Sequence, residues 1–288
     1  MTEKTRPDPT PTAEAASAGR VRLLVIDPQN DFMDIAGAAL PVPGADADMR
    51  RVAAFIDAVQ HEIDELIVTL DSHASVGIER TTFWVDAAGA PVAPLTFITA
   101  ADVRAGKFAP RIATHAKEAL RYLDDLEAAS GRTLIVWPVH CVLGTWGHNI
   151  HAALAESIAG WELATGRTCD KVLKGLNPMT EQYSAFRAEV PRADDARTAN
   201  NAHLMARLGA AGPALLVAGE ALSHCVAASG EDMLAQLDGA RLRNTVFLSD
   251  CMSPVAGFEA AGQQFLDKLG AHGVRVMRSE QAVKAFGA

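Results

Sequence analysis

The chain alternates short apolar runs with longer segments whose apolar residues recur at helical spacing. The apolar runs fall at 21–27, 65–71, 133–139, 170–174, 214–219, 245–250 and 274–277. The helical patterns between them fall near 47–62, 114–129, 149–157, 200–208, 225–237 and 258–269. Short continuous runs separated by amphipathic helices are typical of parallel strands that are covered on both faces. We therefore predict an α/β fold, a three-layer αβα sandwich with a six-stranded parallel sheet.

Two segments depart from this alternation. Residues 1–20 mix Pro, Thr, Glu and small residues without a period, which predicts a flexible N-terminal tail. Residues 78–111 are rich in Pro, Gly and aromatic residues and predict a long excursion over the strand ends. Such a segment is either a lid or binding loop or an ordinary surface insertion. Because no linker divides 21–288, we expect these residues to form a single domain.

Composition narrows the classes of partner. The 288 residues are 49% hydrophobic and 21% charged, which is typical of a globular protein. A net charge of -9 without any run of basic residues argues against nucleic acid as a partner. The longest apolar stretch is too short to span a membrane, and the first twenty residues lack the apolar core of a secretory signal. We therefore expect a cytoplasmic protein without membrane or nucleic-acid partners, whose four cysteines form no disulfide framework.

Chemically reactive side chains follow the predicted strands. They are Asp27, the pair Asp71 and His73, the pair His140 and Cys141, Lys174, and the pair His224 and Cys225. Each residue alone has a structural interpretation, as a helix cap or a hydrogen-bonded core histidine. In a parallel sheet, however, ligands bind at the carboxyl ends of the strands, where these residues would converge. The pattern therefore favours a functional site.

Cys225 is the best candidate for a nucleophile. It lies between a strand and a helix, where free N–H groups and the helix dipole would lower its pKa and favour the thiolate. Asp27 and Lys174 are the charged groups available to move its proton and to stabilise charge, and the backbone N–H of Cys225 could bind an oxyanion. Cys169 and Cys251 lack such a context and are interpreted as structural.

Asp71, His73 and His140 are candidate metal ligands. Asp71 and His73 are two positions apart, so both side chains leave an extended strand on one face. One carboxylate and two imidazoles suit zinc, iron or manganese, with open positions for water or substrate. The spacing alone is also compatible with an aspartate that orients a structural histidine.

Taken together, these segments resemble the isochorismatase-like cysteine hydrolases, and among them most closely the nicotinamidases. The resemblance spans 21 to the C-terminus and rests on VIDPQNDF, GAALPVPGA, TLDSH, WPVHC, LGTWG, LKGLNPMTEQYSAF and GEALSHCVAAS. It implies the isochorismatase-like hydrolase fold, with Asp27 as general base, Lys174 as its electrostatic partner and Cys225 as the nucleophile that attacks an amide carbonyl.

The resemblance also implies the remaining parts of a site. A divalent metal ion, zinc before iron or manganese, would be held by Asp71, His73 and His140 and would bind a pyridine nitrogen. The peptide bond between Glu220 and Ala221 would be cis, with the N–H groups of Ala221 and Cys225 as the oxyanion hole. Phe32, Trp137 and Tyr183 would contact the substrate ring. The family further implies a homo-oligomer and a place in pyridine nucleotide salvage.

Two departures from the family pattern concern the substrate. Many nicotinamidases carry a second histidine soon after the D-x-H pair, whereas here the segment ASVGIERTTFW has Gly77 and no imidazole. The excursion is longer than in compact nicotinamidases, which makes Phe83 and Trp84 candidate substrate contacts. Cys225 argues against vinyl-ether hydrolysis, because isochorismatases proper lack this cysteine.

The leading hypothesis is therefore an amidohydrolase that converts nicotinamide to nicotinate through a cysteine thioester, with release of ammonia. Within the same class, the alternative is a hydrolase of another small amide or of a ureido or carbamoyl compound. A second hypothesis makes metal-bound water the nucleophile and Cys225 incidental. A third is a non-catalytic binding protein on the same fold.

Overall fold

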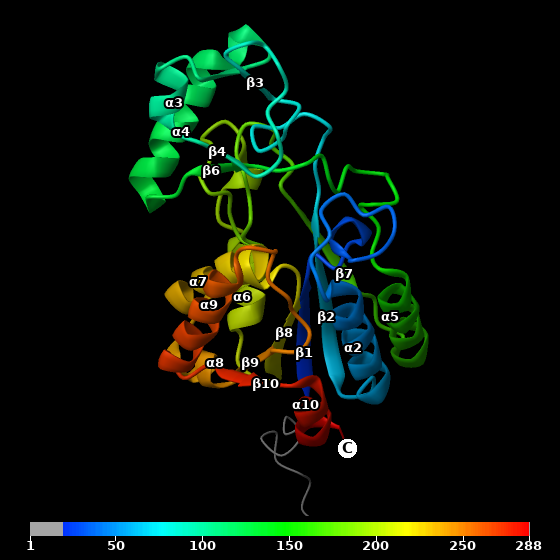
Figure 1. The fold of residues 1–288 in the computed structure, drawn as a ribbon. Helices are drawn as coiled ribbons and strands as arrows, with labels where there is room; N and C mark the ends of the chain where they lie inside the picture. Colours follow the sequence, from blue (N-terminus) through cyan, green and yellow to red (C-terminus); the bar gives the residue numbers. More distant parts are fainter. Residues whose placement is uncertain (1–19, 288) are drawn as a thin grey trace, which may run out of the picture.

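A six-stranded, all-parallel sheet forms the centre of the molecule, as predicted (Figure 1). The computed structural model describes residues 20–287. The strand order is β10 (Arg275–Met277), β9 (Thr245–Leu248), β8 (Ala214–Gly219), β1 (Val21–Ile26), β2 (Ile63–Asp71) and β7 (Asp170–Lys174). The predicted tail 1–20 lies outside the described residues except for Arg20, whose carbonyl accepts the N–H of Ala214.

Helices cover both faces of this sheet, which gives the three layers (Figure 1). One face carries α2 (Ala45–Ala58), α5 (Ala152–Thr165) and α10 (Ser279–Phe286). The other carries α6 (Ala202–Gly209), α7 (Ala227–Gln236) and α9 (Glu259–Ala271), with the short α8 (Gly239–Arg243) preceding β9. Helix α5 is longer than the expected 149–157 and ends at Thr165, just before Gly166, whose φ of 68° is the left-handed conformation that glycine adopts at helix C-termini.

The strand β1 shows why continuous apolar runs form this sheet. Val21, Leu23 and Val25 pack into the hydrophobic cluster beneath α2 and α5, whereas Leu24 and Ile26 pack into the cluster beneath α6, α7 and α9. All five side chains are fully buried. Because successive side chains of a strand point to opposite faces, a strand that packs into both clusters needs apolar residues at nearly every position, and in β1 only Arg22 interrupts the run.

The run at 133–139 is not a strand of the central sheet, which corrects its assignment. Its residues Leu134–Val136 form β6, which pairs antiparallel with β4 (Thr96–Ile98) of the excursion. A short buried run has the same apolar pattern in a parallel sheet and in a covered antiparallel ribbon, so periodicity does not distinguish them.

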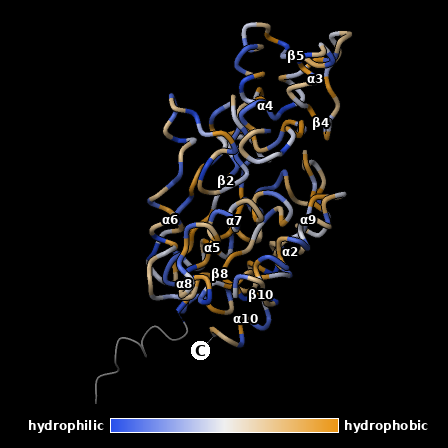
Figure 2. The backbone as a smooth tube through the Cα atoms, turned by 90° about the vertical axis from the view of Figure 1, so that its left-hand side faces the viewer, coloured by the Kyte–Doolittle hydropathy of each residue, from blue (hydrophilic) through white to orange (hydrophobic). Residues whose placement is uncertain are grey.

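The excursion contains regular structure of its own, although its sequence shows no clear period. It holds β3 (Trp84–Asp86), β4, α3 (Ala100–Arg104) and β5 (Phe108–Pro110), and β3 pairs antiparallel with β5. Together with β6 and α4 (Ala116–Ser130) it encloses a third hydrophobic cluster, which includes Trp84, Leu123 and Val136. Figure 2 shows hydrophobic stretches both in this upper part and around the central strands below it.

Short helical turns complete the chain. They are η1 (Asn30–Phe32), η2 (Ala113–His115), η3 (Ala196–Thr198) and the π-helical turn η4 (Leu222–Val226), which leads directly into α7. Among residues 20–287, no helix combines the length and apolarity needed to cross a membrane.

Candidate active site

Lys174 lies at the centre of a buried cluster of charged groups at the carboxyl ends of β1, β2 and β7. Its Nζ lies 2.8 Å from Asp27 Oδ2, 2.9 Å from Asp71 Oδ1 and 3.6 Å from the Sγ of Cys225. It also donates a hydrogen bond to the carbonyl of Gln182 at 3.1 Å. Although burial opposes a charged lysine, the carboxylates of Asp27 and Asp71 hold its pKa well above the ordinary value. Lys174 therefore stays a cation in contact with both carboxylates and the thiol.

Asp27 is held in an unusual backbone conformation directly after β1. Its φ is 45°, a left-handed value that non-glycine residues rarely adopt and that is frequent at functional sites. The Oγ1 of Thr69 donates to Asp27 Oδ1 at 2.6 Å and also accepts the Asp27 N–H at 3.0 Å. Burial raises the pKa of Asp27 above 3.8, while the charge of Lys174 opposes that rise. The carboxyl group is thus fixed in place and prepared to accept a proton more readily than an exposed aspartate.

Cys225 lies in η4, between β8 and α7, as predicted, but its ionisation differs from the expectation. Burial raises the pKa of Cys225 well above the ordinary value, and the charges of Asp27 and Asp71 add to the rise, against the opposing charge of Lys174. The helix N-terminus does not compensate for burial beside two carboxylates. The resting thiol is therefore protonated, and it requires a base before it can act as a nucleophile.

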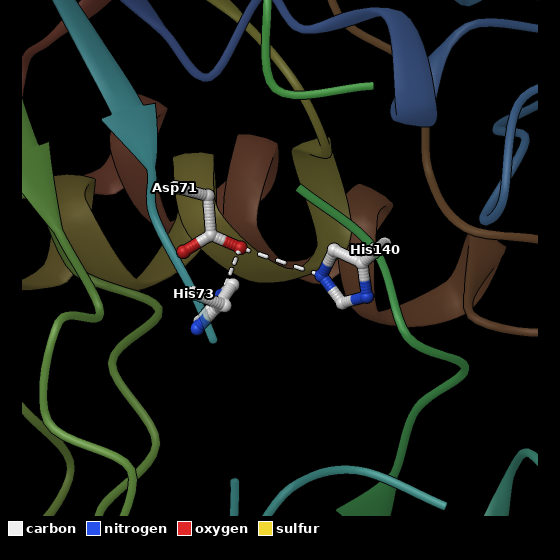
Figure 3. Close-up of side chains that lie close together, drawn as sticks. All are labelled: Asp71, His73 and His140. Carbon is white, nitrogen blue, oxygen red and sulfur yellow. Dashed lines mark ion pairs between the residues drawn. The ribbon is translucent and has the colours of Figure 1, made fainter. Parts of the chain in front are cut away.

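Asp71, His73 and His140 meet as predicted and form a group that can hold a metal ion (Figure 3). The Nε2 of His73 lies 2.7 Å and the Nε2 of His140 lies 3.4 Å from Asp71 Oδ2. Their ligand atoms all lie within 4.8 Å of one another. Burial, followed by the charge of Arg80, lowers the pKa of His140 to about 4, so the ring is neutral as metal ligation requires. One oxygen and two nitrogen donors fit zinc, iron or manganese.

Glu79 and Arg80 support these two histidines and were not identified from the sequence. Glu79 Oε1 lies 3.4 Å from the Nδ1 of His73 and accepts from the Nε of Arg80 at 2.9 Å. The Nη1 of Arg80 contacts the Nδ1 of His140, and both side chains are buried. A carboxylate behind a metal-binding histidine is the usual way to fix its ring. Only their position eight and nine residues after Asp71 could have drawn attention to them.

Gln29 and Asp31 fix the backbone on which the metal-binding group rests. Gln29 exchanges two hydrogen bonds with the backbone of Asp71, accepting its N–H at 2.7 Å and donating to its carbonyl at 2.8 Å. Asp31 Oδ2 accepts the N–H of Cys141 at 2.7 Å, directly after His140. His140 is therefore delivered by an irregular segment beside β2 and not by a strand of the central sheet.

A small cavity lies beside Cys225. Its lining includes Phe32, Trp137 and Tyr183, the three residues expected to contact a substrate ring, together with Asp71, His140, Ala221 and Cys225. Trp137 Nε1 donates to the hydroxyl of Tyr183 at 2.9 Å. The peptide bond between Glu220 and Ala221 is cis, as expected.

Phe83 and Trp84 do not line this cavity, which corrects their assignment as substrate contacts. Both side chains are buried in the hydrophobic cluster of the excursion, where Trp84 donates its Nε1–H to the carbonyl of Ile78. Their aromatic character serves the core of the excursion.

No protein-family model and no curated protein matches this chain, but solved structures do. The yeast nicotinamidase bound to the inhibitor nicotinaldehyde matches with a TM-score of 0.60 and 21% identity, covering 90% of this chain and 99% of that one. A Pyrococcus horikoshii pyrazinamidase in complex with zinc matches with a TM-score of 0.51 and 19% identity, covering 90% and 99%. An isochorismatase-like hydrolase from Alkaliphilus metalliredigens matches with a TM-score of 0.51 and 18% identity, covering 93% and 99%.

These likenesses extend over nearly the whole of each neighbour and include the nicotinamidases that the sequence segments resemble. Because the sequence identities are only 18–21%, these structural matches establish the fold and not the activity. The chain thus has the isochorismatase-like hydrolase fold.

Proposed function

We propose that this protein is a cysteine amidohydrolase that releases ammonia from a small carboxamide, with nicotinamide as the first candidate substrate. The observation that carries the proposal is the position of Lys174, whose Nζ contacts Asp27, Asp71 and the thiol of Cys225 in a buried site. The fold shared with nicotinamidases and a pyrazinamidase supports the same substrate class.

The protonated state of the Cys225 thiol determines the first step. Asp27 takes the thiol proton, and the thiolate forms a bond to the amide carbon while Lys174 keeps the surrounding negative charge balanced. The N–H groups of Ala221 and Cys225 would hold the oxyanion. Asp27 then passes the proton to the leaving nitrogen, which departs as ammonia. Water, activated by the same carboxylate, cleaves the thioester and releases the acid.

Asp71, His73 and His140 would hold a divalent metal ion, for which their donor atoms and neutral imidazoles fit. When bound, the ion would supply a positive site for a ring nitrogen of the substrate. Phe32, Trp137 and Tyr183 would enclose the ring, and the hydrogen bond from Trp137 keeps the Tyr183 hydroxyl in place.

The test is ammonia release by the purified protein from nicotinamide, beside a panel of other small amides and ureido compounds. We expect turnover of nicotinamide that is lost in Cys225→Ala and retained in Cys141→Ala. Cys141 is a matched control because it is also buried and follows a candidate metal ligand, but it lies outside the contacts of Lys174.

Each other outcome of this experiment supports one of the alternative functions. Turnover retained in Cys225→Ala would reject the thioester route in favour of a metal-activated water. Cys225-dependent turnover of a ureido compound, with nicotinamide inert and no stoichiometric metal, would reject the pyridine carboxamide and keep the mechanism. Binding of amides without any hydrolysis would indicate a non-catalytic protein.

A further inference from the structure

Two cavities of very different size share part of their lining near Cys225. The cavity that Cys225 lines has a volume of about 30 Å³, and the adjoining one has about 520 Å³. Glu181, Tyr183 and His224 line both, and the ring centroids of Tyr183 and His224 lie 5.4 Å apart, so these two side chains pack together in the wall between the cavities. The larger volume is in the range of cavities that bind drug-sized ligands. A compact ring amide at Cys225 would leave it empty.

The larger cavity has an apolar interior between the two halves of the molecule. Leu126 and Leu134 come from α4 and β6 above, and Ala228, Ala261 and Phe265 come from α7 and α9 below. The cavity is therefore suited to an apolar chain or ring, which a ligand in the first cavity would extend past Tyr183 and His224.

Both cations that line this cavity are paired with carboxylates, and the remaining carboxyl group of the lining, Glu181, is buried. Arg132 forms ion pairs with Glu189 at 2.8 Å and with Glu231 at 3.4 Å, and Lys268 pairs with Glu231 at 3.0 Å. These cations are already engaged by carboxylates, so a phosphate or carboxylate on the ligand would have to displace an existing ion pair. The lining thus favours an uncharged ligand.

The position of the proposed proton-transfer groups indicates which end of the substrate enters. Asp27 and Lys174 line neither cavity, whereas Tyr183 and His224, beside the expected ring position, line both. Ammonia would leave on the side of Asp27. A group that extends into the larger cavity must therefore belong to the acyl part, which stays bonded to Cys225.

We infer that the 520 Å³ cavity is an acyl-extension pocket, and that the site takes uncharged aromatic carboxamides longer than nicotinamide. This inference rests on the proposed function for the reaction, but the pocket itself is testable by binding alone. Each methylene transferred into an apolar pocket contributes about fourfold to affinity or to kcat/KM.

The experiment compares nicotinamide with nicotinamides that carry ethyl or butyl groups at ring position 5 or 6. Ala261→Phe narrows the larger cavity from α9, and Ala260→Phe places the same ring at an exposed neighbouring position that does not line it. We expect kcat/KM of the wild type to rise with chain length for at least one ring position. Ala261→Phe should lower kcat/KM of the butyl amide by about tenfold or more and that of nicotinamide by less than about twofold. Ala260→Phe should change neither.

The inference is overturned if butyl amides at both positions are poorer substrates than nicotinamide, or if Ala261→Phe affects short and long amides equally. Calorimetric binding of nicotinic acid and the butyl nicotinic acids distinguishes failure of the acyl-extension pocket from failure of the proposed function. If no amide is hydrolysed but the butyl acid binds more tightly than nicotinic acid, and Ala261→Phe removes the difference, the pocket stands and the reaction is wrong. Equal affinity for the two acids rejects the pocket.

Discussion

Replacing Lys174 with methionine removes the cation from the centre of the site and keeps an unbranched side chain of similar length. Asp27 and Asp71 would then be buried without the ammonium group that lies 2.8 and 2.9 Å from them. Their pKa values should rise, because burial favours the protonated form once the cation is gone. We expect both a loss of ammonia release and a lower free energy of unfolding.

The size of the stability loss follows from these distances. At an effective dielectric constant of about 20, each pair contributes about 6 kcal/mol of attraction. Most of this is offset by the cost of burying the three charges, and losing one partner of a buried pair typically costs about 3–5 kcal/mol. For a chain of this size, that corresponds to a fall in Tm of about 10 °C.

The pH dependence distinguishes lost charge from lost packing. In Lys174→Met the two carboxyls have folded-state pKa values above their unfolded values, so the variant gains stability as the pH falls and they become protonated. The difference from the wild type should therefore be smaller at pH 5 than at pH 8. Urea unfolding at the two pH values measures it, with Lys171→Met, an exposed lysine of the same strand, as control. A loss that is equal at both pH values, or absent, would refute this reasoning.

Two further substitutions test neighbouring features. Burial, followed by the charge of a nearby arginine, lowers the pKa of His224 to about 4. Between about pH 6.5 and 4, the unfolded chain therefore binds a proton at His224 that the folded chain does not bind. As a result, acid lowers the stability of the wild type. The free energy of unfolding of the wild type, measured with urea, should fall between about pH 7 and 4.5, and His224→Gln should reduce that fall by about 2 kcal/mol. The exposed control His272→Gln should keep the pH dependence of the wild type. If both variants show the same dependence of unfolding free energy on pH, burial of His224 is not its cause. Gly175 has a φ of 73°, and a Cβ there would lie 2.6 Å from the Cε1 of His73, so Gly175→Ala should weaken zinc binding by about tenfold in a chelator competition. Gly166→Ala, with a φ of 68° and no neighbour within 4 Å, is the control for backbone strain, and equal zinc affinity in both variants would show that His73 is not displaced.

The strands of the central sheet could be predicted because burial on both faces leaves a strong signal. The run 214–219, which follows Gly212 and Pro213, is buried at every position, as its continuous apolar sequence predicts. The run 133–139 has the same continuous apolar pattern, but it is buried outside the central sheet, because the excursion and α4 cover β6. The excursion itself was not predicted as structured because its strands are three residues long, too short for alternation to be recognised.

The residues of the candidate site that lie at the ends of parallel strands could be predicted from the sequence. The residues that reach the site only through tertiary packing could not. Asp27 directly follows β1, and Asp71 and Lys174 end the adjacent strands β2 and β7, so topology alone places them side by side. Glu79 and Glu181 follow no strand and belong to no local pattern, although both are buried beside the site. The raised pKa of Cys225 could not be predicted for the same reason, because the local helix start is visible in the sequence and the surrounding carboxylates are not.

The hydrophobic cluster of the excursion allows the shape of the larger cavity to change independently of the position of the reactive groups. The wall of the larger cavity contributed by α4 and β6 rests on this cluster, whereas Cys225 rests on the cluster beneath α6, α7 and α9. Insertions or core changes between 84 and 126, which leave Glu79 and Arg80 behind the metal-binding histidines untouched, can therefore reshape the compartment next to the thiol without shifting the reactive groups. For protein engineering, this segment is a replaceable part in which new amide preferences can be sought while the chemistry is left in place.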